Sequence, residues 1–291
     1  MDLYTRSRQR TRWRDLAAYE FPLPPLDEQR RTAEILWAAE EVIEGLCVAQ
    51  EAAWSLRSRL LDEFLVQGQP GLHSLYEESA LGRLPATWAV RACEDLLLEA
   101  PRNGFSPETN AEGVGRPTLS IAAVRDGQIV TEGNVKYAKV ADTDIERFLL
   151  RPGDLLVVRG NGNRSLVAKC GLVGQVPESC FYPDLLIRLK FDPSLMRSEF
   201  ACIEWNAPSV HQRLLTRAKS TNGIWKVNGR DLRQHLLAVP PVEEQEAFLK
   251  SMEPCTCVAK SSQAHLASTR VLKVALLERL LTPPQSLQIG R

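Results

Sequence analysis

The feature of this chain that most constrains its fold is a segment that occurs twice, 216 residues apart and without a gap. Pro24-Pro25-Leu26-Asp27-Glu28-Gln29 returns as Pro240-Pro241-Val242-Glu243-Glu244-Gln245. The same offset places Arg14-Asp15-Leu16 on Arg230-Asp231-Leu232, Val42 on Val258 and Leu65 on Leu281. The sequence between the copies is not repeated. Such a repeat predicts two equivalent structural units that hold a different domain between them.

The composition is that of an ordinary globular protein, with 44% hydrophobic and 25% charged residues. Because the formal net charge is zero, a nucleic-acid partner would have to bind a local basic patch. Seven cysteines have neither zinc-ligand nor disulfide spacing, which indicates reduced, mostly buried thiols in a cytoplasmic protein. No apolar run approaches the ~20 residues of a membrane span, and residues 1–14 lack the apolar core of a secretory signal.

The first copy of the repeat predicts a long helix over residues 24–69, with the two prolines at its start and Gly68 and Pro70 at its end. Apolar and small residues recur in it at an alternating spacing of four and three, which is typical of a helix that packs against another helix. They are Ile35, Ala39, Val42, Leu46, Ala49, Ala53, Leu56 and Leu60. A helix of this length is roughly 60 Å long, so the seam needs a partner helix.

The second copy, residues 240–282, is the natural partner, although its equivalent positions are more polar. They are Ser251, Cys255, Val258, Ser262, His265, Thr269, Leu272 and Leu276. Pro254 is expected to interrupt or kink this helix. The pairing can be within one chain or between chains, and a helical hairpin that serves only for packing is an alternative.

The middle region, residues 82–239, is expected to be a mixed α+β domain. Short apolar runs bounded by turn residues predict strands at Thr118–Val124, Gly127–Val130, Asp154–Arg159, Leu166–Val176 and Leu185–Phe191. A helix is expected over Glu199–Arg217, with an interruption at Pro208.

Two segments of the middle domain are candidates for contact with DNA. The first, Arg159-Gly160-Asn161-Gly162-Asn163-Arg164, lacks the third glycine and the following helix of a dinucleotide-binding loop. It is therefore either a plain hairpin turn, which Asn-Gly favours, or an exposed loop that meets DNA. Its candidate residues are Arg159, Asn161, Asn163, Arg164 and the nearby Lys169.

The second segment is Arg213–Arg233, where six basic residues stand against one acid, Asp231. Lys, Arg, Ser and Thr side chains commonly contact phosphates, and Arg, Asn and Gln commonly read bases. The candidates here are Arg217, Lys219, Ser220, Thr221, Asn222 and Lys226. The N-terminal region has the same bias at the corresponding place before the first repeat, with Arg6, Arg8, Arg10, Arg12 and Arg14.

No catalytic motif is found. The sequence contains no Asn-Pro-Pro-aromatic tetrapeptide of adenine methyltransferases, no P-loop and no common nuclease core. His211, His235 and His265 are expected to be packing or surface residues, because none has a partner nucleophile and acid. An enzyme built on one of the cysteines remains a distant alternative, and it would require a thiol of lowered pKa.

Four segments together resemble the specificity subunit of type I restriction–modification systems. They are the two Pro-Pro corners, Leu84-Pro85-Ala86-Thr87-Trp88, Pro152-Gly153-Asp154-Leu155-Leu156-Val157, and Gly223-Ile224 followed by Arg230-Asp231-Leu232. Their order and spacing cover nearly the whole chain. The resemblance implies a DNA-reading protein without catalysis of its own, in which two recognition domains are held apart by an antiparallel coiled coil.

The resemblance also implies partners and domain bounds. Methyltransferase and restriction subunits would join this chain on double-stranded DNA and would bind S-adenosylmethionine, ATP and Mg²⁺, so the chain itself needs no cofactor or metal. The expected parts are a recognition-domain tail (1–23), a first helix (24–69), one recognition domain (82–239), a second helix (240–282) and a tail (283–291).

The expected chain differs from the family in having one complete recognition domain instead of two. It is then a half-length subunit that pairs with a second copy or with a separately encoded half, or a truncated remnant that no longer supports methylation. A coiled-coil scaffold whose middle domain binds protein is the alternative from a different class.

Overall fold

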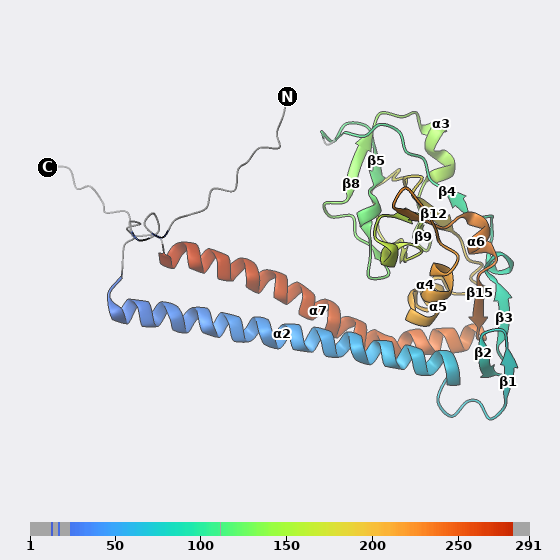
Figure 1. The fold of residues 1–291 in the computed structure, drawn as a ribbon, viewed down its shortest axis with the longest axis horizontal. Helices are drawn as coiled ribbons and strands as arrows, with labels where there is room; N and C mark the ends of the chain where they lie inside the picture. The colour runs from blue at the N-terminus through green and yellow to red at the C-terminus, as the bar shows by residue number, and fades with distance from the viewer. Residues whose placement is uncertain (1–12, 14–16, 18–23, 111, 282–291) are drawn as a thin grey trace. The chain divides into compact units, whose positions relative to one another are not determined.

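The computed structural model describes residues 13, 17, 24–110 and 112–281. The five N-terminal arginines, most of the expected tail 1–23 and the tail 283–291 lie outside these residues. The chain divides into two compact units, Met1–Ala53 with Cys257–Arg291, and Trp54–Thr256. Helices and several small sheets confirm the expected mixed α+β class (Figure 1).

Both copies of the repeat form long helices, as predicted. Helix α2 spans Leu26–Gln67 and helix α7 spans Val242–Leu281. Acidic residues occupy the first turn of each helix, where they complement the partial positive charge of its N-terminus. Of the predicted interruption or kink at Pro254, the interruption is wrong, because α7 continues through the proline. Pro254 is exposed, so water can hydrogen-bond to the backbone carbonyl that the proline leaves without its helical donor.

The predicted seam of the two helices is half correct. The expected residues Ile35, Val42, Ala49 and Leu56 are exposed, and so are Ser251, Val258, His265 and Leu272. The seam residues that are at least partly buried in α2 are Leu36, Ala39, Ile43, Leu46, Gln50, Ala53, Arg57, Leu60 and Phe64. In α7 they are Met252, Cys255, Ala259, Ser262, Leu266, Thr269, Lys273 and Leu276. In each helix, every second predicted seam residue is exposed, and the residue that follows it in the sequence is at least partly buried instead.

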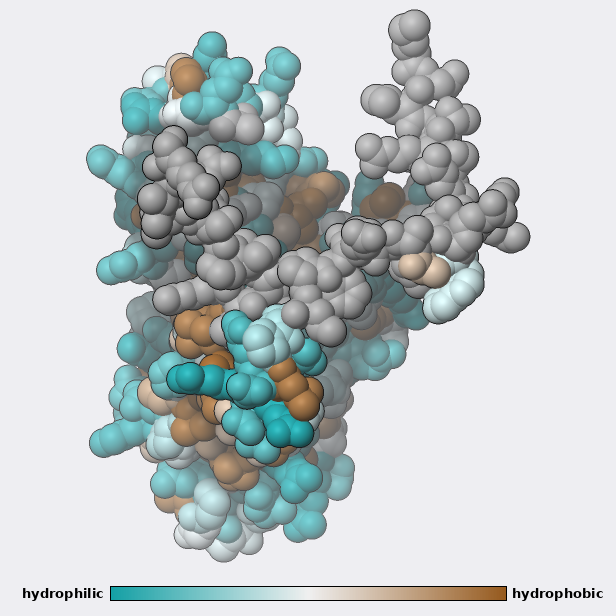
Figure 2. All heavy atoms as spheres, turned by 90° about the vertical axis from the view of Figure 1, so that its left-hand side faces the viewer, coloured by the Kyte–Doolittle hydropathy of each residue, from teal (hydrophilic) through white to brown (hydrophobic). Residues whose placement is uncertain are grey.

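This correction preserves the repeat, because the buried positions of α2 and α7 are again 216 residues apart. Apolar residues consequently remain on the outer face of α2, where Val42 and Leu56 are about half exposed. The face drawn in Figure 2 carries brown apolar patches among teal hydrophilic residues.

The two helices contact each other in both units. In the first unit, Lys273 forms an ion pair with Glu40. In the second unit, the Phe64 ring stacks on Phe248 with ring centroids 4.0 Å apart. Phe64 also packs against Trp88 and Phe200, so the end of α2 lies in the main hydrophobic core of that unit.

The second unit is built around a six-stranded sheet in the order β4-β12-β9-β11-β7-β6. These strands are β4 (Arg102–Asn103), β6 (Val124–Arg125), β7 (Gln128–Ile129), β9 (Leu155–Val158), β11 (Cys170–Leu172) and β12 (Leu186–Leu189). Every residue of the antiparallel neighbours β9 and β12 is buried. Their apolar runs match strands that are covered on both faces.

Helix α4 packs against β11 of this sheet, and further helices and smaller sheets extend the unit. The helices are α3 (Asp142–Ile145), α4 (Ser198–Asn206), α5 (Pro208–Leu215) and α6 (Gly229–Arg233), with 3₁₀ turns at Cys93–Leu96, Ile121–Ala123, Glu146–Phe148 and Arg164–Leu166. The paired strands are β1 (Tyr76–Ser79) with β2 (Gly82–Pro85), β5 (Arg116–Leu119) with β8 (Val135–Ala138), and β3 (Ala89–Ala92) with β15 (Leu236–Val239). The β3–β15 pair joins the beginning of the middle domain to its end.

The predicted helix over Glu199–Arg217 is confirmed as α4 and α5, which meet at Pro208 as expected. The predicted strand regions Gly127–Val130, Asp154–Arg159 and Leu185–Phe191 each contain a shorter strand. The prediction for Thr118–Val124 is mostly wrong, because this stretch holds the end of β5, the 3₁₀ turn Ile121–Ala123 and the first residue of β6. The prediction for Leu166–Val176 is mostly wrong, because only Cys170–Leu172 is a strand. A 3₁₀ turn ends at Leu166, and Ala168 has a φ of +62°, which is incompatible with extended backbone.

Two leucines of α2 test which side of the helix is buried. Leu61 is 4% exposed and Leu56 is 50% exposed. We expect Leu61→Ala to lower the free energy of unfolding by about 2–5 kcal/mol, as for other buried leucines. Leu56→Ala should cost less than about 1 kcal/mol. Urea unfolding of the two variants measures both, and an equal loss would restore the seam predicted from the sequence.

Candidate nucleic-acid interface

The two candidate segments, far apart in sequence, meet in one three-stranded antiparallel sheet. Its order is β10-β14-β13, with β10 at Gly160–Asn161, β14 at Ile224–Lys226 and β13 at Lys219–Thr221. Gly160 pairs with Lys226 and Asn161 with Trp225. The segment 159–164 is therefore not a plain hairpin turn, because it belongs to the long connection between β9 and β11 and contributes a strand to this sheet.

Strands β13 and β14 form a hairpin whose turn is Asn222-Gly223. Both residues have positive φ, +52° and +76°, as a type I′ turn requires. This turn geometry explains why Asn and Gly occupy these positions. Both residues are exposed, so the Asn222 amide lies at the tip of the hairpin with access to a partner.

One face of the small sheet concentrates positive charge. Lys219 and Lys226 lie directly opposite each other on β13 and β14, and directly opposite residues of an antiparallel pair project to the same face. Like charges in this position destabilise a sheet. Both lysines and Arg217 are exposed, and no ion pair is found for any of the three among the residues described. An external anion would relieve the repulsion.

Three other predicted DNA-binding residues have partners inside the protein. Arg159 Nη1 donates to the Asp184 carbonyl at 3.3 Å and lies 3.8 Å from its carboxylate. Arg164 Nη2 donates to the Leu215 carbonyl at 3.2 Å, and its guanidinium lies 4.7 Å from the centre of the Trp225 ring. Lys169 Nζ donates to the Asn206 carbonyl at 3.2 Å, and burial lowers its pKa. These contacts hold the connection 159–169 against the rest of the domain.

The remaining candidates are distributed along the sheet. Asn163 Oδ1 accepts from Ser165 N at 3.0 Å and caps the following 3₁₀ turn. Asn161 Oδ1 accepts from Asn163 N at 2.9 Å. Ser220 is exposed opposite Trp225, and Thr221 lies on β13 opposite Ile224. A role in DNA binding stays a prediction for all eleven residues.

One buried carboxylate of the second Pro-Pro corner contacts the start of the middle domain. Glu244 is 4% exposed. Its Oε2 accepts from Trp88 Nε1 at 2.9 Å, while Oε1 accepts from Gln69 N at 2.9 Å and lies 2.8 Å from His73 Nε2. The sequence identified both the Pro-x-x-Trp and the Pro-Pro-Val-Glu-Glu-Gln motifs, and the structure shows that they are contact partners.

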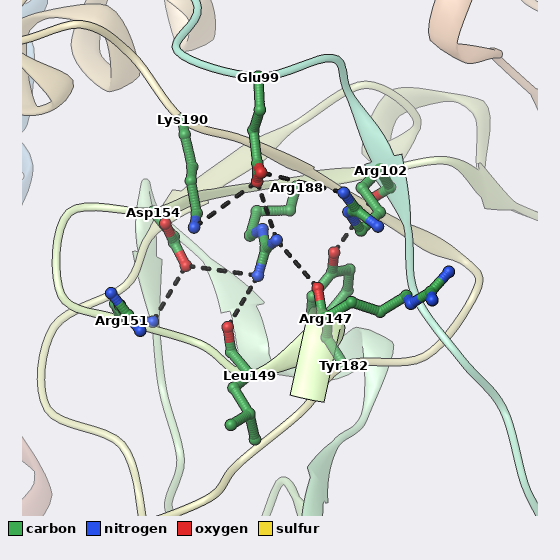
Figure 3. Close-up of polar contacts among 9 residues, drawn as sticks. All are labelled: Glu99, Arg102, Arg147, Leu149, Arg151, Asp154, Tyr182, Arg188 and Lys190. Atoms are coloured by element: carbon green, nitrogen blue, oxygen red, sulfur yellow. Dashed lines mark hydrogen bonds and ion pairs between the residues drawn. The ribbon is translucent and has the colours of Figure 1, made fainter. Parts of the chain in front are cut away.

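Sequence reasoning missed a polar network around the buried Arg188 on β12 (Figure 3). Arg188 donates to the carbonyls of Leu149 at 2.7 Å and Arg147 at 3.0 Å, and to Glu99 Oε1 at 2.9 Å. The segment 147–151 is thereby held against the sheet. The available signal was a single arginine within the apolar run Leu185–Leu189.

The acids of this network respond differently to their surroundings. Burial raises the pKa of Asp154 and outweighs both the hydrogen bond from Arg151 N and the attraction of Arg188, 4.0 Å away. Burial also acts to raise the pKa of Glu99, but Arg188, Lys190 and Arg102 together lower it. The cations around Glu99 thus favour its ionised form, and the network is consistent with a structural role.

The histidines and cysteines take the roles expected of them. His211 is buried within hydrogen-bonding distance of the Val167 carbonyl, and burial lowers the pKa of His235 to about 3. His265 is exposed. All seven cysteines are free thiols, four of them buried. Burial raises the pKa of Cys180 to about 12, the opposite of what a nucleophile requires. None of the helices in the described part is long and apolar enough to cross a membrane.

Replacing Arg188 tests the network. We expect Arg188→Met to lower the free energy of unfolding by about 3–5 kcal/mol, because the variant leaves buried carbonyls and an acid without their donor. Lys190→Met is the matched control. Lys190 is partly exposed and lies 3.6 Å from the same Glu99 carboxylate, so its loss should cost less than about 1 kcal/mol. Urea unfolding compares the two, and similar small losses would contradict a structural role for Arg188.

Comparison with known proteins supports the resemblance seen in the motifs. No protein-family model matches the chain. The chain is 27% identical over 242 residues to the type I restriction enzyme EcoKI specificity subunit of Escherichia coli, which covers 80% of this chain and 49% of the relative. It is 20% identical over 210 residues to the putative type I restriction enzyme MjaX specificity subunit of Methanocaldococcus jannaschii, covering 71% and 48%.

Solved structures show the same fold. The type I restriction–modification S subunit from M. genitalium aligns with a TM-score of 0.59 at 13% identity, over 88% of this chain and 61% of that one. A chain from a structural study of complex assembly and conformational transition of a type I restriction–modification system aligns with a TM-score of 0.55 at 20% identity, over 92% and 63%.

The chain spans about half the length of the curated relatives it matches. Over that span it is similar in sequence and in fold to the specificity subunits of type I restriction enzymes, as its motifs indicated.

Proposed function

We propose that this protein is a non-catalytic DNA-recognition subunit of a type I restriction–modification complex. The observation that carries the proposal is the face of the β10-β14-β13 sheet, where Lys219 and Lys226 oppose each other without an acidic partner among the described residues. A DNA backbone supplies the negative charge that this face lacks. The similarity to specificity subunits supports the same function.

Within this interface the residues divide into two roles. Arg217, Lys219 and Lys226 contact phosphates, because they are exposed and form no ion pair with another described residue. Asn222 and Ser220 are the candidates for contact with bases, since an amide or hydroxyl at a hairpin can enter a groove. Arg159, Arg164 and Lys169 use some of their donors internally and act mainly by holding the sheet in place, with their remaining N–H groups directed to DNA.

The two long helices act as the spacer of the complex. Within the second unit, Phe64 contacts Phe248 and the Gln69 backbone contacts Glu244, so residue numbers rise along α2 as they fall along α7. We take this as the beginning of an antiparallel coiled coil that flanks the recognition domain. The alternating spacing of three and four between buried residues in both helices supports it.

The similarity to specificity subunits also indicates the partners. Methyltransferase and restriction subunits assemble with this chain on double-stranded DNA in the cytoplasm, and they bind the S-adenosylmethionine, ATP and Mg²⁺ that the reactions need. A bipartite target requires a second recognition domain, from a second copy or from a separately encoded half.

Double substitution of Lys219 and Lys226 by Ala tests the phosphate contacts. Each phosphate contact contributes about one unit to the slope of log K against log salt. We expect the double variant to bind DNA of any sequence more weakly and to lose about two units of that slope. Lys250→Ala, which removes an exposed lysine on α7, is the control. Filter binding of the assembled complex over a salt series measures the slope, and an unchanged slope would remove these lysines from the interface.

The function as a whole is tested by mapping adenine methylation across the genome. Cells that carry this gene with its methyltransferase partner should show a bipartite motif that disappears when this gene alone is deleted. Unchanged methylation would contradict the proposal. It would leave a protein-binding scaffold or a truncated remnant as the better interpretation, and a scaffold would bind its partner with little dependence on salt.

A further inference from the structure

The segment Gly160-Asn161-Gly162-Asn163 contains two glycines that its backbone conformation does not require. Neither Gly160 nor Gly162 has a positive φ, so neither position needs the conformational freedom of glycine. Their surroundings differ. Gly160 is buried, whereas Gly162 is exposed, and beyond its chain neighbours a Cβ at Gly162 would meet no atom of the described residues within 4 Å. Only Gly160 therefore has a neighbour that can require a glycine.

This neighbour is the side chain of Lys226. Gly160 and Lys226 are directly opposite each other on β10 and β14, where two Cβ atoms are normally roughly 4.5–5.5 Å apart. A Cβ on Gly160 would lie only 3.1 Å from Lys226 Cγ, which is closer than ordinary van der Waals contact. The stem of Lys226 thus leans across Gly160. The next nearest atoms to such a Cβ, Leu185 Cδ2 and the Trp225 carbonyl oxygen, are each 3.5 Å away and leave room for it.

The stem of Lys226 leans away from the second lysine of this face. Strand β14 lies between β10 and β13, so Gly160 and Lys219 flank Lys226 on opposite sides of the sheet. Like charges directly opposite each other on neighbouring strands repel and destabilise a sheet. A lysine that leans toward β10 has more space between its charge and that of Lys219 than one that stands upright.

We propose that Gly160 is a positioning residue of the DNA-binding face, where it leaves the space for Lys226 to lean across β10, so that Lys219 and Lys226 hold two separate phosphates. The inference rests on the proposed function and adds the residue that spaces its phosphate contacts. A methyl group at position 160 pushes the stem of Lys226 back toward Lys219, and a single phosphate then takes up both charges. Each separately neutralised phosphate contributes about one unit to the slope of log K against log salt, so the spacing can be measured.

The first test measures the salt dependence of DNA binding, with the complex of this chain and its methyltransferase partner on a duplex of arbitrary sequence. Gly160→Ala should lower the slope by about one unit, although both lysines are still present. Lys226→Ala should lower the slope by the same amount, and addition of Gly160→Ala to that variant should lower it no further. Gly162→Ala is the matched control and should keep the original slope, because its methyl group meets open space. An unchanged slope in Gly160→Ala, or equal losses for the two glycines, would overturn the proposal.

The second test needs no DNA and uses urea unfolding of the full chain. Alanine in place of glycine at a compatible backbone position stabilises a protein by restricting its unfolded chain. We expect Gly160→Ala to raise the urea midpoint more in the Lys226→Ala variant than in the original chain, because the lysine stem is what crowds the new methyl group. Gly162→Ala should shift the midpoint equally in both backgrounds. Equal shifts for Gly160→Ala would show that Lys226 does not occupy this space and would contradict the inference.

The two tests separate failure of this inference from failure of the proposed function. If binding of the unsubstituted complex to DNA hardly depends on salt, the proposed function fails, and the role of Gly160 in phosphate contact fails with it. The unfolding cycle then still reports whether Gly160 makes room for Lys226. A steep slope that Gly160→Ala leaves unchanged overturns the inference alone.

Discussion

The structure depends on the burial of one carboxylate. An ionised group that is 4% exposed is destabilising unless its oxygens are hydrogen-bonded. The donors to Glu244 come from the backbone just after α2 and from Trp88 and His73 at the entry of the recognition domain. Each donor satisfies part of the same charge, so the end of α2, the start of α7 and the domain entry are fixed together. The cost of leaving this carboxylate unpaired makes the arrangement specific.

Strands, rather than loops, connect this corner to the β10-β14-β13 sheet. Strand β15 pairs with β3 directly after Trp88, and the chain before it forms α6 and the β13–β14 hairpin. The other side of the sheet comes from β10, which follows the buried strand β9. Arg164 over Trp225 joins the two sides. The exposed lysines are thus carried by backbone whose position is set by the core, which suits the DNA contacts proposed for them.

The sequence predicted both long helices, the α+β class and the two basic segments, because each leaves a regular pattern or a local composition. It did not predict which stripe of each helix is buried. Ile35, Val42 and Leu56 are as apolar as Leu36 and Ile43, and at 3.6 residues per turn both stripes keep a three-four spacing. The repeat does not show which stripe is buried, because the buried positions differ from the predicted ones by the same one-residue offset in both helices. Composition also could not separate Arg164 and Lys169, which bond to internal carbonyls, from Lys219 and Lys226, which have no acidic partner in the described structure.

The net charge of the chain is zero. Attraction of DNA phosphates would therefore depend on a few cations such as Lys219 and Lys226. A protein that neutralises many phosphates binds DNA of any sequence tightly. Base contacts then contribute only a small part of its binding free energy. Here acids elsewhere on the surface balance the basic residues, and Arg159 and Arg188 pair with Asp184 and Glu99. For the DNA-recognition function proposed above, weak electrostatic attraction by one domain leaves most of the binding free energy to base contacts and to the joint action of linked domains. Selectivity in such a complex depends on two domains that engage the same DNA.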